Sequence, residues 1–498
     1  MNKTRPLLLM LCGISSWGCQ DPAAAPPRIV IDGTMSDWST LEPVAGQALD
    51  ASESARPALG RLWVSHDERS LLLRFEVTPE TNLQVDNDLS LCLDTDGDAA
   101  TGQLVNGLGA ELCWRFGERR GTFVTPEGAT EVEHQHIGLV SAPTVTGTDF
   151  EMSLALDAEP VAGYQLFPGT EVRLVVGNGQ GDWLPASAGG ARYAIAGPVP
   201  PPLAPIDIAR MRPDHVRFLS YNLNNHLTDP ARRAALSRIL NAIDADVLLL
   251  QEIRDTPTDE AVAYVLSLLD RGREEWNTVT IGGESTLVFS KFPILRADSL
   301  GDSGALLLDL EPGAEEDVNR QGVMLLIAMS LPCCNEQARR SEEADLLASY
   351  VRDAKSGSGA LAIPRGTPIV MMGDANLVGL ARDRRALQDG TIVDVATYGP
   401  GAPPDWDGTS LADLVPHITH LPQAFTWYGE DFPPGRLDYL FYSDSELVIA
   451  NRFVLYTPAV PEETLRAWGL EASDTDVVTD HLPVVADLVL VGEGDQEA

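Results

Sequence analysis

The spacing of hydrophobic residues changes part of the way along this chain, and the change separates two regions. In residues 71–77 and 172–176, every second residue is apolar, which is the period of a β-strand with one buried face. Turn-forming Gly, Asp, Asn and Pro recur at short intervals from residue 28 to 195, and no long segment there has the period of a helix. We therefore expect an all-β sandwich over residues 28–195.

From residue 215 to 492, strand patterns alternate with helix patterns. Two amphipathic segments predict helices: one has an apolar stripe within 236–243 and a start signal at Asp229-Pro230, and the other covers 341–351. Several short segments predict buried strands, among them residues 216–221, 246–251, 323–328, 369–372 and 484–490. This alternation predicts an α/β domain.

Proline-rich segments separate the predicted parts. Residues 198–202 read Pro-Val-Pro-Pro-Pro, and proline holds the chain extended, so we place a linker at 196–214. Residues 20–27 are rich in Ala and Pro and are interpreted as a tether.

The N-terminus has the pattern of an export signal, in which basic residues precede the apolar run 7–11. Ser-Trp-Gly-Cys at 16–19 resembles a bacterial lipoprotein cleavage box, which implies a signal peptide over 1–19 and lipidation of Cys19. Gln20 then favours the outer membrane. The alternative is an ordinary signal that is cleaved after the alanines at 23–25 and releases the protein outside the cell.

Acidic residues dominate the charge: 73 Asp and Glu stand against 35 Lys and Arg in 498 residues, for a formal net charge of -38. Tight binding to nucleic acid normally requires cationic side chains that neutralise phosphates. The balance argues against a high-affinity nucleic-acid binder, but not against an enzyme that meets its phosphate substrate through bound cations.

Four cysteines follow the export segment, and disulfides persist in an oxidising compartment. Cys92 and Cys113 lie in neighbouring predicted strands and form the favoured pair. Cys333 and Cys334 are adjacent, as either two thiols or a vicinal disulfide.

Polar residues follow the predicted strands of the second region at several points. Carboxylates and amides that meet from several strand ends suit a hard cation such as Mg²⁺, and such an ion polarises a phosphoryl oxygen. The motifs are Tyr221-Asn222-Leu223, Gln251-Glu252-Ile253, Gly373-Asp374-Ala375-Asn376, Arg436-Leu437-Asp438-Tyr439 and Asp480-His481-Leu482-Pro483-Val484.

This ordered set resembles the endonuclease/exonuclease/phosphatase superfamily, over essentially all of 215–492. The resemblance implies a four-layer α/β sandwich, with two stacked sheets flanked by helices, and a metal-dependent phosphodiesterase, nuclease or phosphatase. It assigns a Mg²⁺ or Mn²⁺ ion to three ligands, Asn222, Glu252 and Asp480.

The resemblance also assigns four catalytic residues. Asp374 would orient or deprotonate the attacking water, and Asn376 would hydrogen-bond the transition state. His481 would contact the phosphate or activate water, with Asp438 fixing its tautomer.

The sequence departs from the family at Ser330, where many members carry a histidine. A serine hydroxyl donates a hydrogen bond but is a poor proton donor near pH 7, so the general acid is in question. Protonation of the leaving group would then fall to a metal-bound water, or turnover would be slow. Three histidines are candidates to replace it: His226, His417 and His420.

The first region resembles family-9 carbohydrate-binding modules, which implies a glycan partner. The resemblance rests on Ile31-Asp32-Gly33, Asp37-Trp38, Leu93-Asp94-Thr95-Asp96-Gly97-Asp98 and Thr101-Gly102. Three carboxylates there either ligate Ca²⁺ or form a solvated turn: Asp94, Asp96 and Asp98. The spacing does not fit an EF-hand, because the sixth position is not Gly and the twelfth is not Glu.

The sequence therefore predicts an exported phosphoester hydrolase with an accessory β-sandwich. Its substrate would be a small phosphoester, a lipid head group or a nucleic acid. The alternative is a non-catalytic surface lipoprotein that binds glycan or another ligand and keeps a degenerate hydrolase domain.

Overall fold

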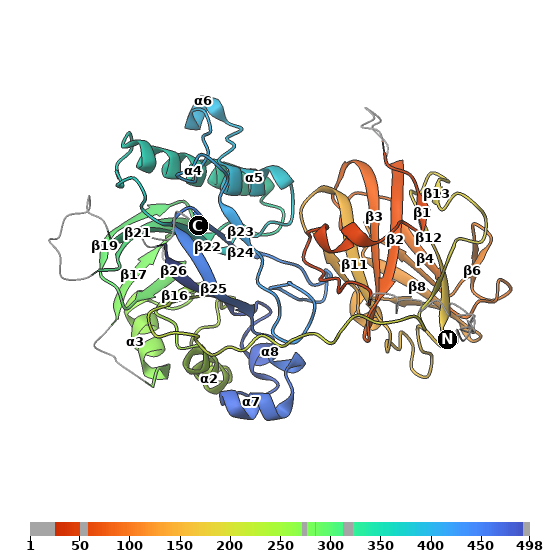
Figure 1. The fold of residues 1–498 in the computed structure, drawn as a ribbon. Helices are drawn as coiled ribbons and strands as arrows, with labels where there is room; N and C mark the ends of the chain where they lie inside the picture. The colour runs from red at the N-terminus through yellow and green to blue at the C-terminus, as the bar shows by residue number, and fades with distance from the viewer. Residues whose placement is uncertain (1–24, 50–57, 271–275, 284, 312–321, 492–498) are drawn as a thin grey trace, which may run out of the picture.

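The computed structural model describes residues 25–49, 58–270, 276–283, 285–311 and 322–491 (Figure 1). The predicted signal peptide, with Cys19, and most of the predicted tether lie outside the described residues. Among the described residues, no helix combines the length and apolar character needed to cross a membrane.

The N-terminal region consists mainly of two antiparallel sheets. The first has the order β1 (Ala45–Gly46), β2 (Ala58–His66), β3 (Ser70–Thr81), β11 (Gly147–Ala155), β10 (Val140–Ala142). The second has the order β13 (Trp183–Leu184), β12 (Glu171–Gly177), β4 (Ser90–Asp94), β7 (Leu112–Arg115), β8 (Arg120–Thr125), β9 (Gly128–Val132), with β14 (Ala191–Ala194) beside β12. The smaller elements are a 3-10 helix at Ser36–Thr40, the hairpin β5 (Gln103–Val105) and β6 (Leu108–Ala110), and α1 (His134–Ile137).

The core of this region lies between the two sheets. Phe75 and Phe150 of the first sheet belong to the same buried cluster as Leu93 and Trp114 of the second, which is the buried face that the alternating pattern predicted. Cys92 and Cys113 are register partners and form a disulfide, as expected. The prediction of a β-rich N-terminal region is confirmed.

The C-terminal region contains two six-stranded sheets. One has the order β17 (Asn277–Ile281), β18 (Thr286–Ser290), β16 (Val247–Gln251), β15 (Val216–Asn222), β26 (Val484–Leu490), β25 (Leu447–Val454). The other has the order β19 (Ile294–Leu300), β20 (Ser303–Asp309), β21 (Val323–Ser330), β22 (Ile369–Asp374), β24 (Asp438–Tyr442), β23 (Ala412–Leu414). The pairs β15–β16 and β21–β22 are parallel, and the other neighbours are antiparallel.

Helices lie on opposite sides of this pair of sheets (Figure 1). One side carries α2 (Arg233–Ile243), α3 (Thr258–Leu268), α7 (Glu462–Trp468) and α8 (Asp474–Val478), with a short 3-10 helix at Thr457–Ala459. The other side carries α4 (Gln337–Ser356), α5 (Ala381–Asp389) and α6 (Val395–Tyr398). Phe218 and Met372, from different sheets, share one buried cluster, so the two sheets pack together. The predicted α/β character is confirmed.

One predicted boundary is wrong. Helix α2 begins at Arg233 and not at Asp229-Pro230. The Asp229 carboxylate accepts a hydrogen bond from the Ala231 amide at 2.9 Å, so it closes a turn ahead of the helix and does not cap the helix itself.

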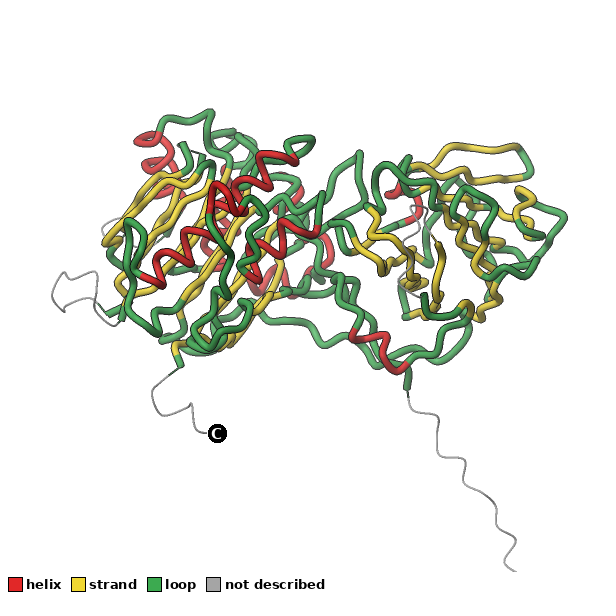
Figure 2. The backbone as a smooth tube through the Cα atoms, turned by 90° about the horizontal axis from the view of Figure 1, so that it is seen from above, coloured by secondary structure: helices red, strands yellow, loops and turns green. Residues whose placement is uncertain are grey.

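The two regions touch along a shared surface (Figure 2). Ile31 pairs with the 422–424 segment through two backbone hydrogen bonds of 3.0 and 3.1 Å. Thr144 and Thr146 contact the segment 377–381, which follows β22. The N-terminal region therefore packs against the segment just beyond the end of a central strand.

Candidate active site

The polar motifs of the C-terminal region meet at one edge of the two sheets. Asn222 and Asp374 are the last residues of β15 and β22, and Glu252 follows β16 directly. Asp438 is the first residue of β24, which runs antiparallel to β22. Asp438 is the register partner of Asp374. Since strand ends from both sheets arrive at this edge, five motifs that are far apart in sequence lie together.

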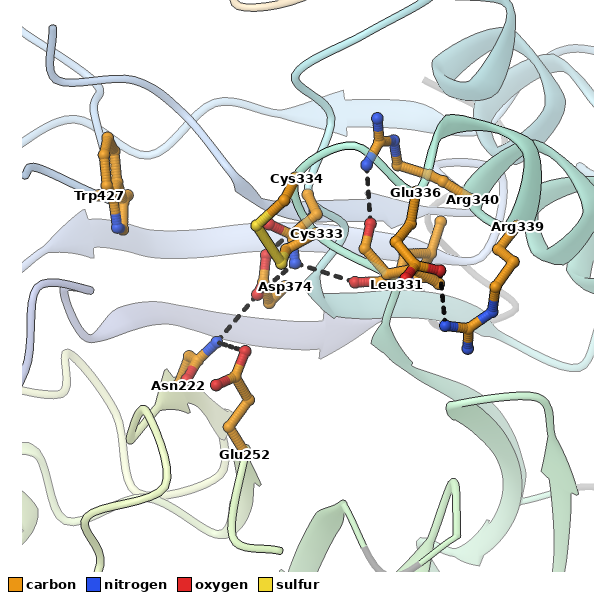
Figure 3. Close-up of a disulfide and its surroundings, with 12 residues drawn as sticks. Asn222, Glu252, Leu331, Cys333, Cys334, Glu336, Arg339, Arg340, Asp374 and Trp427 are labelled. Carbon is orange, nitrogen blue, oxygen red and sulfur yellow. Dashed lines mark hydrogen bonds and ion pairs between the residues drawn. A yellow bond between two sulfur atoms is a disulfide. The ribbon is translucent and has the colours of Figure 1, made fainter. Parts of the chain in front are cut away.

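Asn222 joins the two sheets at the centre of the site. Its Nδ2 atom donates to Glu252 Oε1 at 3.1 Å and to Asp374 Oδ2 at 2.9 Å (Figure 3). Asn225, which the sequence analysis did not single out, donates to the other oxygen of Glu252 at 3.1 Å. Glu252 itself has a φ of 54°, a left-handed conformation that non-glycine residues seldom adopt.

Asn376 holds Asp374 from the other side. Its backbone amide donates to Asp374 Oδ1 at 3.0 Å, and its Nδ2 atom donates to Asp374 Oδ2 at 2.8 Å and to the Leu331 carbonyl at 2.9 Å. Both side-chain amide hydrogens are thus engaged within the protein. In this arrangement Asn376 positions the carboxylate.

Asp438 and His481 form a buried pair. His481 Nδ1 lies 3.0 Å from Asp438 Oδ2, and the two residues are 6% and 1% exposed. The other carboxylate oxygen, Asp438 Oδ1, is buried without a hydrogen-bond partner among the described residues. The contact orients the imidazole and leaves its Nε2 atom for a ligand.

The charges at this edge shift two pKa values strongly. Burial raises the pKa of Asp374 to about 7; His481 opposes the shift, while Asp438 and Glu252 add to it. Burial lowers the pKa of His481, but Asp438 and Asp374 outweigh it and raise that pKa to about 9. At neutral pH the imidazole is therefore a cation among carboxylates, and it suits phosphate contact better than proton abstraction.

Of the predicted metal ligands, Asn222 and Glu252 touch each other, and Asp480 accepts hydrogen bonds from Trp427 Nε1 at 2.9 Å and Asn224 Nδ2 at 3.1 Å. Three of the four residues predicted to be catalytic, Asp374, Asp438 and His481, form a group whose carboxylate and imidazole atoms lie within 4.8 Å of one another.

The donor set nevertheless fits a hard cation. The side-chain contacts of Glu252 come from neutral amides, and Asp438 Oδ1 has no partner among the described residues. Carboxylate and amide oxygens are the ligands that Mg²⁺ and Mn²⁺ prefer. A divalent ion would relieve the repulsion from Asp438 and Glu252, which adds to the effect of burial on the pKa of Asp374.

Ser330 lies beside this cluster as the register partner of Asp374, and its amide donates to Ser303 Oγ at 3.1 Å. The three histidines considered as its replacement have other surroundings. His417 lies 3.5 Å from Asp32 at the contact between the regions, His420 packs against Trp468, and His226 is exposed.

Cys333 and Cys334 form a vicinal disulfide at the rim of the site. Figure 3 draws it beside Asp374, with Asn222 and Glu252 nearby. The loop is anchored by Leu331 and by Pro332, whose carbonyl accepts from the buried Arg340 at 2.7 Å. Both cysteines are exposed. The sequence identified the vicinal pair but not its position.

The three candidate calcium ligands, Asp94, Asp96 and Asp98, lie in the N-terminal region, and the fold does not bring all three together. Asp94 and Asp96 cluster with Glu111, which the sequence analysis missed. Asp98 is exposed and its carboxylate accepts from the Ala100 amide. Trp38 and Trp114 are buried, and Trp38 donates to Glu151 at 2.8 Å, so these rings do not offer a face to a sugar.

A family model described as the endonuclease/exonuclease/phosphatase family matches residues 219–481, more than half of the chain. No curated protein matches the chain in sequence.

Similar solved structures include a humanized D. rerio TDP2, with 17% identity, a TM-score of 0.34 and coverage of 55% of this chain and 99% of that one. Sphingomyelinase C from Streptomyces griseocarneus has 16% identity, a TM-score of 0.33 and coverage of 55% and 99%. A mutant beta toxin from Staphylococcus aureus with bound magnesium ions has 14% identity, a TM-score of 0.30 and coverage of 55% and 99%.

Proposed function

Because the chain belongs to the endonuclease/exonuclease/phosphatase family, we propose that it is a metal-dependent phosphoester hydrolase whose active site is the edge described above. One observation carries the proposal. The amide of Asn222 links Glu252 to Asp374 across two sheets, beside the buried Asp438–His481 pair. A family fold that had lost its chemistry would not require this set of buried, mutually repelling carboxylates.

The charges of His481 and Asp374 suit them to different roles in the reaction. His481, as a cation held by Asp438, donates to a phosphate oxygen and neutralises its charge. Asp374, whose pKa is raised to about 7, accepts a proton from the attacking water near neutral pH. Asn222 and Asn376 hold that carboxylate in one orientation.

Glu252, Asn222 and Asp480 would hold a Mg²⁺ or Mn²⁺ ion. When bound, such an ion would polarise the phosphoryl oxygen and stabilise the leaving oxygen. Ser330 lies beside Asp374 and donates at most a hydrogen bond to the leaving group, so substrates with good leaving groups are expected to react fastest.

The substrate is a small phosphoester or a lipid head group in preference to long nucleic acid, because a net charge of -38 repels polyanions. We keep 28–195 and 215–492 as the two domains, joined by the linker 196–214. The hydrophobic clusters on both outer faces and between the sheets support a four-layer sandwich for the second domain. We also propose that the protein is exported and anchored in the outer membrane by a lipid at Cys19. The first domain would bind a glycan.

The test is hydrolysis of a bis-aryl phosphate diester and an aryl phosphate monoester, with Mg²⁺, with Mn²⁺ and with EDTA. We expect EDTA to abolish turnover and Glu252→Gln to lower it about 10²- to 10³-fold. The matched control is Glu260→Gln, an exposed carboxylate on α3, which should leave turnover unchanged.

Equal turnover in Glu252→Gln and in the wild type would contradict the proposed site. Folded wild-type protein with no turnover would favour the second candidate, a ligand-binding protein with an inactive hydrolase domain, which Ser330 supports.

A further inference from the structure

Three carboxylates gather at one end of the N-terminal region, away from the proposed hydrolase site. Asp94 ends β4, Asp96 lies in the turn that follows, and Glu111 lies between β6 and β7. One oxygen atom from each lies within 4.8 Å of the others. Asp94 is 0% exposed and Glu111 is 8% exposed, while Asp96 faces solvent.

One of these oxygens has no partner. Asp94 Oδ1 accepts from the Gly97 amide at 2.7 Å, but Asp94 Oδ2 is buried and accepts no hydrogen bond from any described residue. Burying a carboxylate oxygen without a partner is costly. An unpartnered buried oxygen on a carboxylate of this cluster is the kind of atom that a bound cation would satisfy.

The remaining contacts orient the carboxylates without neutralising them. Glu111 accepts from the Thr95 amide at 2.8 Å and from Thr101 Oγ1 at 3.0 Å, and Thr101 Oγ1 also donates to Asp96 at 3.0 Å. These donors are neutral. Within the part of the chain that the structure describes, no Lys or Arg forms an ion pair with any of the three.

Gly102 packs closely against the cluster. This residue has a φ of 66°, and a Cβ atom there would lie 2.8 Å from Glu111 Oε1 and 2.5 Å from the Ala110 carbonyl oxygen. A side chain at this position would strain the backbone and press on the carboxylate. The turn is therefore shaped around Glu111.

Electrostatics agree with the geometry. Burial raises the pKa of both Asp94 and Glu111, and the neighbouring carboxylates add to each shift. Arg173, the register partner of Asp94, acts in the opposite direction on the pKa of Asp94, so the protein compensates the negative charge of the cluster only in part.

We propose that Asp94, Asp96 and Glu111 bind a calcium ion that ties the end of β4 to the β6–β7 connection. Ca²⁺ accepts six to eight oxygen ligands in flexible geometry, so three carboxylates can be completed by water and nearby carbonyls. Mg²⁺ requires a stricter octahedron and gives up its water reluctantly. Asp98, which the sequence included among the ligands, is replaced by Glu111.

The experiment uses the whole chain after dialysis against EDTA, and measures Ca²⁺ binding by calorimetry and the Tm with and without about 1 mM Ca²⁺, near the weak end of protein sites. We expect Ca²⁺ to raise the Tm of the wild type by several degrees, and the same concentration of Mg²⁺ to raise it less. Glu111→Gln should lose this rise, and Asp98→Asn should keep it.

Asp96→Asn is the second variant, because the exposed side chain can be changed without disturbing the core. Glu252→Gln controls for metal binding at the hydrolase site and should retain the Ca²⁺-dependent rise. A Tm rise in Glu111→Gln and Asp96→Asn equal to that of the wild type, or no rise in the wild type, would overturn the proposal. The calorimetry and the Tm are measured without a phosphoester substrate, so these results do not depend on the proposed function.

Discussion

Both regions of the molecule bury acidic side chains at the ends of strands, but they balance the charge differently. In the C-terminal region, Asp374 and Asp438 lie with His481, which carries a positive charge at neutral pH. In the N-terminal region, the hydrogen bonds to Asp94 and Glu111 come from neutral donors. A cluster that contains its own titratable cation can bind and release protons, whereas we propose that the second cluster takes its cation from solution.

Both sites are groups of three ligand atoms at similar spacing, yet we propose catalysis for the first and stability for the second. In the first group the imidazole would supply a cation for a phosphate to bind. The second group would repel phosphate and attract a metal ion. Charge compensation, and not the number of carboxylates, distinguishes the two.

The largest effect is expected when the internal cation is weakened. Asp438→Asn removes the carboxylate that raises the pKa of His481, so less of the imidazole is charged and its tautomer is no longer fixed. Turnover of an aryl phosphate should fall about 10²- to 10⁴-fold. The control is Asp444→Asn, an exposed residue just after β24. If Asp438→Asn turned over within threefold of the wild-type rate, a charged His481 would not be needed for hydrolysis.

A moderate effect is expected where the N-terminal region touches the active-site strands. The buried Thr144 Oγ1 donates to the Leu377 carbonyl at 2.6 Å and lies 3.3 Å from the Arg436 carbonyl oxygen. Leu377 adjoins Asn376, and Arg436 lies two residues before Asp438. Thr144→Val keeps the shape and removes the hydrogen bond, which should lower kcat about 2- to 10-fold.

The matched control for that variant is Thr146→Val, whose hydroxyl contacts the Ala381 amide further from the catalytic residues. We expect a smaller change in kcat there. Equal losses in both variants would mean that the interface affects the site only through general stability.

The smallest effect concerns pH and the contact between the regions. His134 is buried beside a cavity of about 710 Å³ that is lined from both regions by residues such as Leu156 and Tyr428. Burial lowers the pKa of His134 below its ordinary 6.5, although the Gly429 backbone, Glu133, Arg120 and His136 also act on it. The folded state therefore favours the neutral ring. The stability that depends on it is present above pH 6.5 and is lost as the pH falls.

Thermal unfolding at pH 7.5 and at pH 5.5 checks this expectation. The loss of Tm on acidification should be larger in the wild type than in His134→Gln, while His226→Gln, at an exposed position of the C-terminal region, should behave like the wild type. An identical loss in all three proteins would show that His134 does not couple pH to the interface.

Much of the C-terminal region could be predicted from the sequence, because its signals are local. Apolar runs ending in polar motifs identified β15, β16 and β22 together with Asn222, Glu252 and Asp374. The start of α2 was misplaced, because a capping signature at Asp229 also fits a turn.

The residues that the sequence missed depend on contacts between distant segments. Glu111 follows no strand motif of its own and joins Asp94 only because β7 pairs with β4. Thr144 belongs to one region and supports the active site of the other. Asn225 could have been found, since it lies three residues beyond Asn222 in an asparagine-rich turn.

The ring formed by Cys333 and Cys334 has a practical consequence for anyone who purifies the protein. A thiol reductant converts the ring into two separate side chains, and the backbone between them regains rotations that the ring forbids. The same loop supplies the Leu331 carbonyl that receives the amide of Asn376. A preparation kept in reductant and one kept without it therefore present two different surfaces beside the same carboxylates. Hydrolysis rates measured on the two preparations should not be pooled.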